Sequence, residues 1–138
     1  MATSTLLASC IMMAAHTHSV PPAVLIGIYR AERGRVGQEV SNTNGSFDLG
    51  PMQINTLWIP ELAKRWKVSE KKAREAVRDD TCTNVNVAAW ILRKHLDETK
   101  NLSKALQYYH SRTPKFGKKY KKRVINFMYE HGLLKTKR

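Results

Sequence analysis

Acidic residues, cysteines and long hydrophobic runs are all scarce in this 138-residue sequence. Its 11 Asp and Glu are outnumbered by 24 Lys and Arg, which gives a formal net charge of +13. No apolar run is long enough to cross a bilayer, so we expect no membrane span. The positive excess favours a polyanionic partner by long-range attraction, and nucleic acid, an anionic membrane and the bacterial wall all qualify.

The two cysteines limit the possible sites further. Cys10 and Cys82 are far apart and lack the paired spacing of a zinc site, so the sequence predicts no metal centre. In an oxidising compartment they would form one disulfide that closes a long loop and stabilises the fold by roughly 3 to 5 kcal/mol. At this point two free, buried thiols are an equal alternative.

The length and the composition predict one globular domain over residues 1–138. Apolar residues make up 42% and charged residues 25% of the chain, with no low-complexity tract and no internal repeat. Near the N-terminus, Leu7 to Cys10 resembles a lipoprotein-processing box. No Lys or Arg precedes it, so an export signal is not evident and we expect a helix there instead.

Hydrophobic spacing and helix-boundary residues predict helix after helix. Ser69 and Thr83 are the expected N-caps of the helices that they begin. Gly34 is expected to end the helix that starts at Pro22. The other helices are expected over residues 5–16, 56–66, 102–110 and 115–131. The first of these would bury one face made of Leu6, Leu7, Cys10, Ile11 and Ala14.

The stretch from Ile28 to Asn55 combines an acidic residue, a loop rich in turn-forming residues and a polar segment that ends the loop. Glu32 lies four residues after Ile28 and three after Tyr29, so the apolar stripe of its helix carries a carboxyl group. A glycine- and asparagine-rich loop follows, and the sequence GPMQIN closes it. Glu32 is either an ion-paired acid at a helix end or a general acid whose pKa is raised by burial. The second interpretation is opposed by three neighbouring cations, Arg30, Arg33 and Arg35.

Four segments together resemble a known enzyme family. They are VPPAVLIGIYRAERG, NGSFDLGPMQIN, DDTCTNVNVAAWIL and YYHSRTPKFGKKYKKRV. In this order and spacing, from about Cys10 to Val124, they are similar to the specialised lytic transglycosylases of bacterial secretion, conjugation and pilus systems. That family lies within the goose-type lysozyme superfamily. The resemblance implies a mainly α, lysozyme-like single domain with a short loop or hairpin after the catalytic helix.

The resemblance also implies a set of site residues. Glu32 matches the catalytic acid, and Ser41 matches the family's loop serine. Gln53 and Asn55 match residues that help to build the saccharide cleft. Tyr109 matches a tyrosine near the acid, and its hydroxyl would hydrogen-bond Glu32 or the substrate.

The same comparison of motifs identifies two departures and one pairing. Arg33 stands where the family normally has serine, and Pro51 replaces the leucine of the closing motif. The paired cysteines of the family match Cys10 and Cys82, which implies a disulfide. A disulfide in turn implies a periplasmic or otherwise extracytoplasmic location.

The activity that the resemblance implies is cleavage, without a cofactor, of the MurNAc–GlcNAc β-1,4 bond of peptidoglycan, with a 1,6-anhydro-MurNAc product. The implied role is local opening of the wall for a secretion, conjugation or pilus apparatus. One alternative is a hydrolytic muramidase of the same fold. Another is a non-catalytic basic module that binds the wall or nucleic acid, which the net charge alone would support. No helix-turn-helix is evident, so we expect no specific nucleic-acid partner.

Several other residues have two interpretations. Asp48 is either a loop cap, which we favour, or the second carboxylate of a conventional glycosidase. Trp58 is the best candidate to stack on a sugar ring, whereas Trp90 is predicted to lie in the core. The basic run from Lys115 to Arg123 is predicted to be a solvated helix face that also attracts the protein to the wall or to a partner.

Overall fold

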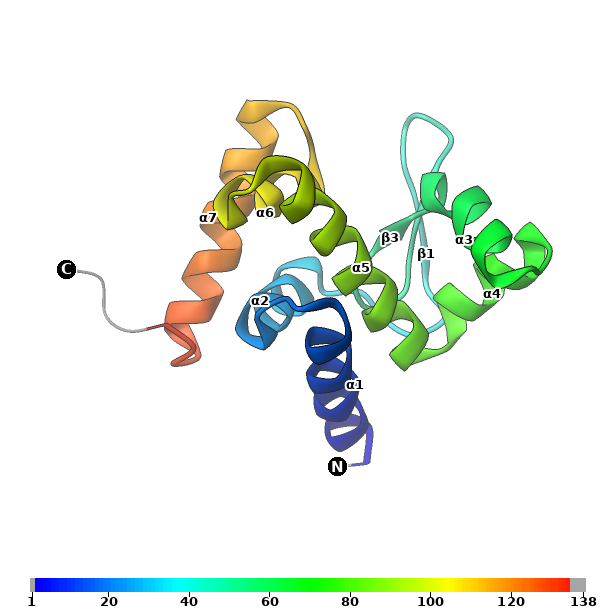
Figure 1. Ribbon diagram of the computed structural model, residues 1–138, viewed down its shortest axis with the longest axis horizontal. Coiled ribbons are helices and arrows are strands. Elements are labelled where there is room, and N and C mark those ends of the chain that lie inside the picture. The colour runs from blue at the N-terminus through cyan, green and yellow to red at the C-terminus, as the bar shows by residue number, and fades with distance from the viewer. Residues whose placement is uncertain (1, 135–138) are drawn as a thin grey trace.

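The structure is a computed structural model that describes residues 2–134, with side chains from residue 5 onward. It is a small, mainly α domain, as the sequence predicts, with one short antiparallel sheet beside the helices (Figure 1). The helices are α1 Ala2–His18, α2 Pro22–Glu32, α3 Ile59–Trp66, α4 Glu70–Asp79, α5 Thr81–Thr99, α6 Leu102–His110 and α7 Pro114–Glu130. No helix within residues 2–134 combines the length and the hydrophobicity that crossing a bilayer requires.

Helix α5 crosses the middle of the molecule and carries much of the core. It packs against α1, α4 and α6, while α2 packs against α7 on the other side (Figure 1). Most of its buried side chains are small or branched and apolar, and they recur at helical spacing along the side facing the other helices. They are Val85, Val87, Ala88, Ala89, Ile91 and Leu92, with Asn84 and His95 as the buried polar members.

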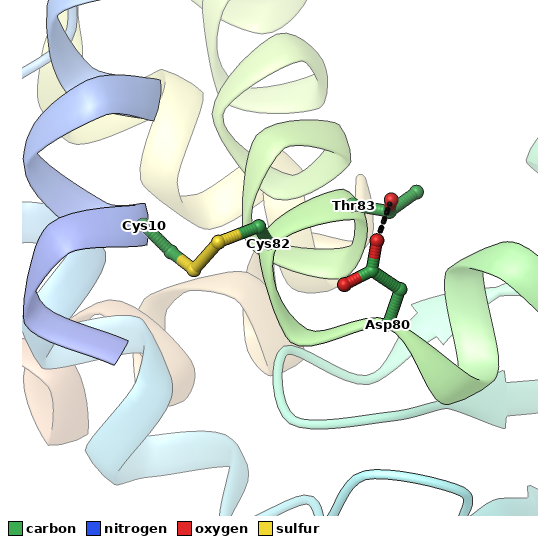
Figure 2. Close-up of a disulfide and its surroundings, with 4 residues drawn as sticks. All are labelled: Cys10, Asp80, Cys82 and Thr83. Atoms are coloured by element: carbon green, nitrogen blue, oxygen red, sulfur yellow. Dashed lines mark hydrogen bonds between the residues drawn. A yellow bond between two sulfur atoms is a disulfide. The ribbon is translucent and has the colours of Figure 1, made fainter. Parts of the chain in front are cut away.

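A disulfide joins the N-terminal helix to this central one. The structure places Cys10 of α1 and Cys82 of the first turn of α5 in a disulfide (Figure 2). Of the predicted α1 face, Cys10, Ile11 and Ala14 are buried and Leu7 packs against the core, but Leu6 is 50% exposed. Helix α1 is also longer at both ends than the predicted range of 5–16.

The start of α5 differs from the prediction. The helix begins at Thr81 and its N-cap is Asp80, not Thr83. The Thr83 hydroxyl donates to the Asp80 carboxylate at 2.7 Å (Figure 2). Thr83 therefore holds the cap residue in place from within the first turn. The prediction for Ser69 was correct, since its hydroxyl accepts from the Lys72 N–H at 3.1 Å.

The turn after α2 also differs in its detail. Helix α2 ends at Glu32, and the left-handed C-cap is Arg33 with φ 57°, where glycine was expected. Gly34 serves another purpose, because a Cβ at this position would overlap the carbonyl oxygen of Gly50. The chain after α2 is thus packed directly on the loop that closes the Ile28 to Asn55 stretch.

That stretch forms the sheet. Strands β1 Glu39–Ser41, β2 Phe47–Leu49 and β3 Ile54–Asn55 pair antiparallel in the order β1-β2-β3. Ser41 faces Phe47 across the first pair, and Asp48 faces Asn55 across the second. A 3-10 turn, Thr56–Trp58, leads from β3 into α3. The expected loop or hairpin is therefore a three-stranded sheet that stands beside the end of α2.

Candidate active site

A cleft of about 780 Å³ runs between the sheet and the helices α5 and α6. The catalytic and substrate-binding candidates named from the sequence all line it, although they come from α2, the sheet and α6. These residues are Glu32, Ser41, Gln53, Asn55 and Tyr109. Asp48 and Trp58 line the same cleft. The fold thus brings together side chains from positions that span most of the chain.

Glu32 lies in a mostly enclosed position at this cleft. Burial raises the pKa of its carboxyl group from 4.5 to about 7, because the charged form loses its hydration. The negative charge of Asp48 raises the pKa further, whereas Tyr120 and the positive charge of Arg123 lower it. A carboxyl group with a pKa near 7 holds a proton close to neutrality and is able to donate it.

The three arginines next to Glu32 in sequence do not act on it as expected. Arg30, Arg33 and Arg35 line a separate pocket of about 360 Å³ together with Phe127 of α7. None of the three is among the charges that change the pKa of Glu32. Arg33, which stands where the family has serine, is the left-handed C-cap of α2 and belongs to this second pocket.

Two tyrosines near the acid have different roles. The hydroxyl of Tyr109 donates to the carbonyl oxygen of Met52 at 3.0 Å, so the expected bond to Glu32 is absent among the described side chains. Tyr120 of α7 is the tyrosine that interacts with Glu32 and lowers the pKa of its carboxyl group. The Tyr120 hydroxyl is buried, and its contact with Glu32 falls short of standard hydrogen-bond geometry.

Tyr120 was not predicted from the sequence. It belongs to the buried stripe of α7 with Gly117, Val124 and Met128, and this spacing is the signal that indicates an inward-facing residue. Nothing in the spacing indicates that the side chain reaches an acid on another helix. The His110 ring stacks on Tyr120 with centroids 4.6 Å apart and an interplanar angle of 6°.

The sheet side of the cleft is held by amide side chains. Asn55 donates to Asp48 at 3.0 Å and to Ser46 at 3.0 Å, while its oxygen accepts from the Leu57 N–H at 2.9 Å. Gln53 has a left-handed backbone with φ 53°, and its side chain donates to the Gly50 carbonyl at 3.1 Å. These amides fix the shape of the cleft wall. Asp48 is tied into the same wall by Asn55, which agrees with a loop-shaping role.

A buried asparagine holds the turn behind that wall. Asn84 of α5 is 0% exposed and accepts from the Met52 N–H at 2.8 Å. Its amide nitrogen donates to the carbonyls of Leu49 and Val77 at 2.8 and 2.9 Å. Gly50 has φ +66°, and a Cβ there would meet the Asn84 side chain. Asn84 thus links α4, α5 and the closing turn, a role that the sequence pattern did not predict.

Aromatic residues form the other wall. Trp58 lines the cleft as expected for a residue that stacks on sugar, and its ring meets the edge of Trp90 with centroids 5.6 Å apart. Trp90, predicted to lie in the core, is half-buried and packs against it, and the cations of Arg65 and Lys94 lie 5.2 and 4.9 Å from its ring centroid. Within residues 5–134, no group of three or more His, Cys, Asp or Glu is arranged to hold a metal ion.

A mainly helical domain with an enclosed glutamic acid at a cleft is typical of the lysozyme-like class of glycan-cleaving domains. The model of the family described as the transglycosylase SLT domain matches residues 9–126, and the chain belongs to this family. Members of the family are lytic transglycosylases that act on peptidoglycan. A comparison with curated proteins finds no significant match.

Proposed function

We propose that the single domain of residues 1–138 is a peptidoglycan lytic transglycosylase in which Glu32 is first the acid and then the base. The observation that carries the proposal is the enclosed Glu32 carboxyl group, which lines the cleft and has a pKa of about 7. An ion-paired glutamate would be permanently ionised near neutrality and a poor proton donor. Gln53, Asn55 and Ser41 would bind the glycan along the sheet side of the cleft, and Tyr109 would brace the turn beneath it.

The proposed reaction needs one carboxyl group in two protonation states. Protonated Glu32 donates its proton to the oxygen that links MurNAc to GlcNAc, and the bond from MurNAc C1 to this oxygen breaks. The N-acetyl group of MurNAc stabilises the cationic C1. The Glu32 carboxylate then takes the proton of the MurNAc 6-hydroxyl, whose oxygen bonds to C1 and forms the 1,6-anhydro ring. Glu32 regains the proton that it donated, so it is ready for the next catalytic cycle.

Asp48 supports a second candidate, the hydrolytic muramidase. It lines the cleft and its charge acts on Glu32, so it is placed where a carboxylate would activate water. Its hydrogen bond from Asn55 at 3.0 Å and its place in the strand β2 favour a structural role. The two reactions differ in their products, because hydrolysis leaves reducing MurNAc ends and transglycosylation leaves anhydro ends.

The biological setting is part of the same proposal. The disulfide between Cys10 and Cys82 supports an oxidising, periplasmic or otherwise extracytoplasmic location. The small size of the domain and its resemblance to specialised family members support local opening of the wall for a secretion, conjugation or pilus apparatus. The six cations between Lys115 and Arg123 make no ion pair among the described residues, so α7 offers an unneutralised basic face to such a partner or to the wall.

Digestion of purified peptidoglycan, followed by mass spectrometry of the released fragments, tests the proposal. We expect the parent protein to release anhydro-muropeptides. Glu32→Gln keeps the side-chain shape but holds no transferable proton, so its release rate should be reduced by at least about 100-fold. Glu130→Gln, at an exposed acid on α7, is the matched control and should retain the parent rate. Fragments with reducing MurNAc ends would show that the protein is a hydrolytic muramidase and not a lytic transglycosylase. Full activity of Glu32→Gln, or no release by the parent, would contradict the catalytic proposal and favour a binding module.

A further inference from the structure

His95 is a buried titratable residue in the wall of the cleft to which the proposed mechanism gives no role. It lies on α5 with only 6% of its surface exposed, yet it lines the cleft together with Trp58 and Tyr108. Both aromatic rings meet the imidazole edge to face, with centroids 6.1 and 6.0 Å away and interplanar angles of 70° and 90°. Contacts with the two rings therefore restrict the orientation of the imidazole.

The orientation gives the two ring nitrogens different surroundings. Nδ1 is fully enclosed, has no hydrogen-bond partner among the described residues, and lies 3.8 Å from a Glu98 carboxylate oxygen. The part of His95 that reaches the cleft is thus the edge that carries Nε2. Because a carboxylate only accepts hydrogen bonds, Glu98 favours the tautomer with the proton on Nδ1, which leaves a lone pair on Nε2.

Burial and two nearby cations favour the neutral form of His95. Burial lowers the pKa of the imidazole, and the positive charges of Arg112 and Lys94 lower it further, against the opposing effect of Glu98. Arg112 donates to both Glu98 oxygens at 2.7 Å and lies 4.5 Å from the centroid of the Tyr108 ring. The guanidinium of Arg112, which lines the cleft, is therefore paired with the Glu98 carboxylate.

We propose that His95 determines specificity in a sugar subsite between Trp58 and Tyr108, where its Nε2 accepts a hydrogen bond from an N–H or O–H group of an uncharged N-acetylhexosamine. Aromatic side chains and one fixed polar atom suit a pyranose ring, which offers apolar faces and polar edges. The paired state of Arg112 argues against an anionic group, such as a peptide carboxylate, at this position. The inference rests on the proposed function, because it names the part of the glycan that this end of the same cleft holds.

Two substitutions at one position separate the hydrogen bond from the packing. His95→Phe keeps an aromatic ring between Trp58 and Tyr108 but has no acceptor, whereas His95→Gln can place an amide oxygen near the position of Nε2. The affinity for tetra-N-acetylchitotetraose is measured by tryptophan fluorescence in the Glu32→Gln background, where no cleavage intervenes. We expect the Kd of His95→Phe to rise about tenfold, as for the loss of one buried hydrogen bond, and that of His95→Gln to stay within about threefold. His16→Phe, at an exposed histidine on α1, is the control and should leave the Kd unchanged.

Kinetics on peptidoglycan provide the second readout. In the active background, His95→Phe should raise KM about tenfold and change kcat less than twofold, as for a contact that binds the substrate and the transition state equally. Equal Kd values for His95→Phe and the parent, or equally weak binding by both His95 variants, would overturn the inference. Failure of the Glu32→Gln protein to bind the tetrasaccharide while the parent cleaves peptidoglycan would also overturn it and leave the proposed function standing. If the parent releases nothing but the Kd series holds, the proposed reaction fails and the subsite stands.

Discussion

Two glutamates show how differently this highly basic chain treats a carboxyl group. Glu39 of β1 accepts hydrogen bonds from Arg74 at 2.7 and 3.1 Å and from Arg78 at 3.0 Å, and these arginines lower the pKa of its carboxyl group. Glu32 of α2 receives no arginine hydrogen bond among the described residues, and burial raises the pKa of its carboxyl group to about 7. Because the chain has 24 Lys and Arg, a lowered carboxyl pKa is the expected result, so the raised pKa of Glu32 requires an explanation.

The explanation is local backbone geometry. Arg33 ends α2 in a left-handed conformation, and Gly34 then packs against the carbonyl of Gly50. The guanidinium groups of Arg33 and Arg35 are directed into a different pocket, so proximity in sequence does not become proximity in space. In contrast, the arginines that pair with Glu39 both come from α4, which presents them to the same carboxylate. The comparison shows that the pKa of Glu32 is raised by burial, and that the arginines adjacent to it in sequence do not oppose this effect, although Arg123 of α7 lowers the pKa in part.

The largest expected effect comes from breaking the scaffold that encloses Glu32. Asn84→Ala removes three hydrogen bonds, those to the Met52 N–H and to the Leu49 and Val77 carbonyls, from a fully buried position. We expect a loss of about 3 to 5 kcal/mol in the free energy of unfolding, measured by urea denaturation. The alkaline limit of activity should also move to lower pH, because a looser turn admits water to Glu32 and lowers its pKa.

The matched control for this change is two residues away. Asn86 is exposed on the same helix and accepts a bond from the His18 ring at 3.1 Å. Asn86→Ala should change the unfolding free energy by less than about 1 kcal/mol and leave the pH profile of activity unchanged. If the two asparagine variants were equally stable, Asn84 would not be the residue that holds the turn.

A smaller effect follows from the enclosed acid itself. A carboxyl group whose pKa rises from 4.5 in the unfolded chain to about 7 in the folded one destabilises the fold as pH increases through this interval. Removing the charge with Glu32→Gln should therefore stabilise the protein by about 2 to 3 kcal/mol at pH 8 and by almost nothing at pH 4. Urea unfolding of both proteins at several pH values provides the test. A stability difference that is independent of pH would show that Glu32 titrates normally.

The sequence predicts the helical part of this site better than its polar connections. Helical spacing places the acid on α2, and the family resemblance names Ser41, Gln53 and Asn55, which the fold brings to one cleft. Tyr120 and Asn84 were missed, because each acts on an element far away in the chain and neither belongs to a local motif. The N-cap of α5 was predicted wrongly for a similar reason. Asp80 and Thr83 are both acceptable cap residues, and only the path of the chain from α4 decides between them.

The smallest expected effect comes from the other glutamate and has the opposite sign. Glu39→Gln should destabilise the protein by at most about 1 kcal/mol at pH 7, because its ion pairs with Arg74 and Arg78 are only partly shielded from solvent. The lowered pKa of Glu39 makes this contribution present above the unfolded-state value of 4.5 and lost as pH falls through the folded-state value. The stability difference between Glu39→Gln and the parent should thus disappear in acid, where that of Glu32→Gln also vanishes. As pH increases, the two differences should grow in opposite directions.

Glu130→Gln is the control, at an acid that makes no ion pair within the described residues. It should change the unfolding free energy by less than about 0.5 kcal/mol both at pH 7 and in acid. Stabilisation by Glu39→Gln at pH 8 would mean that the arginines fail to hold its carboxylate, and the contrast between the two glutamates would then rest on burial alone.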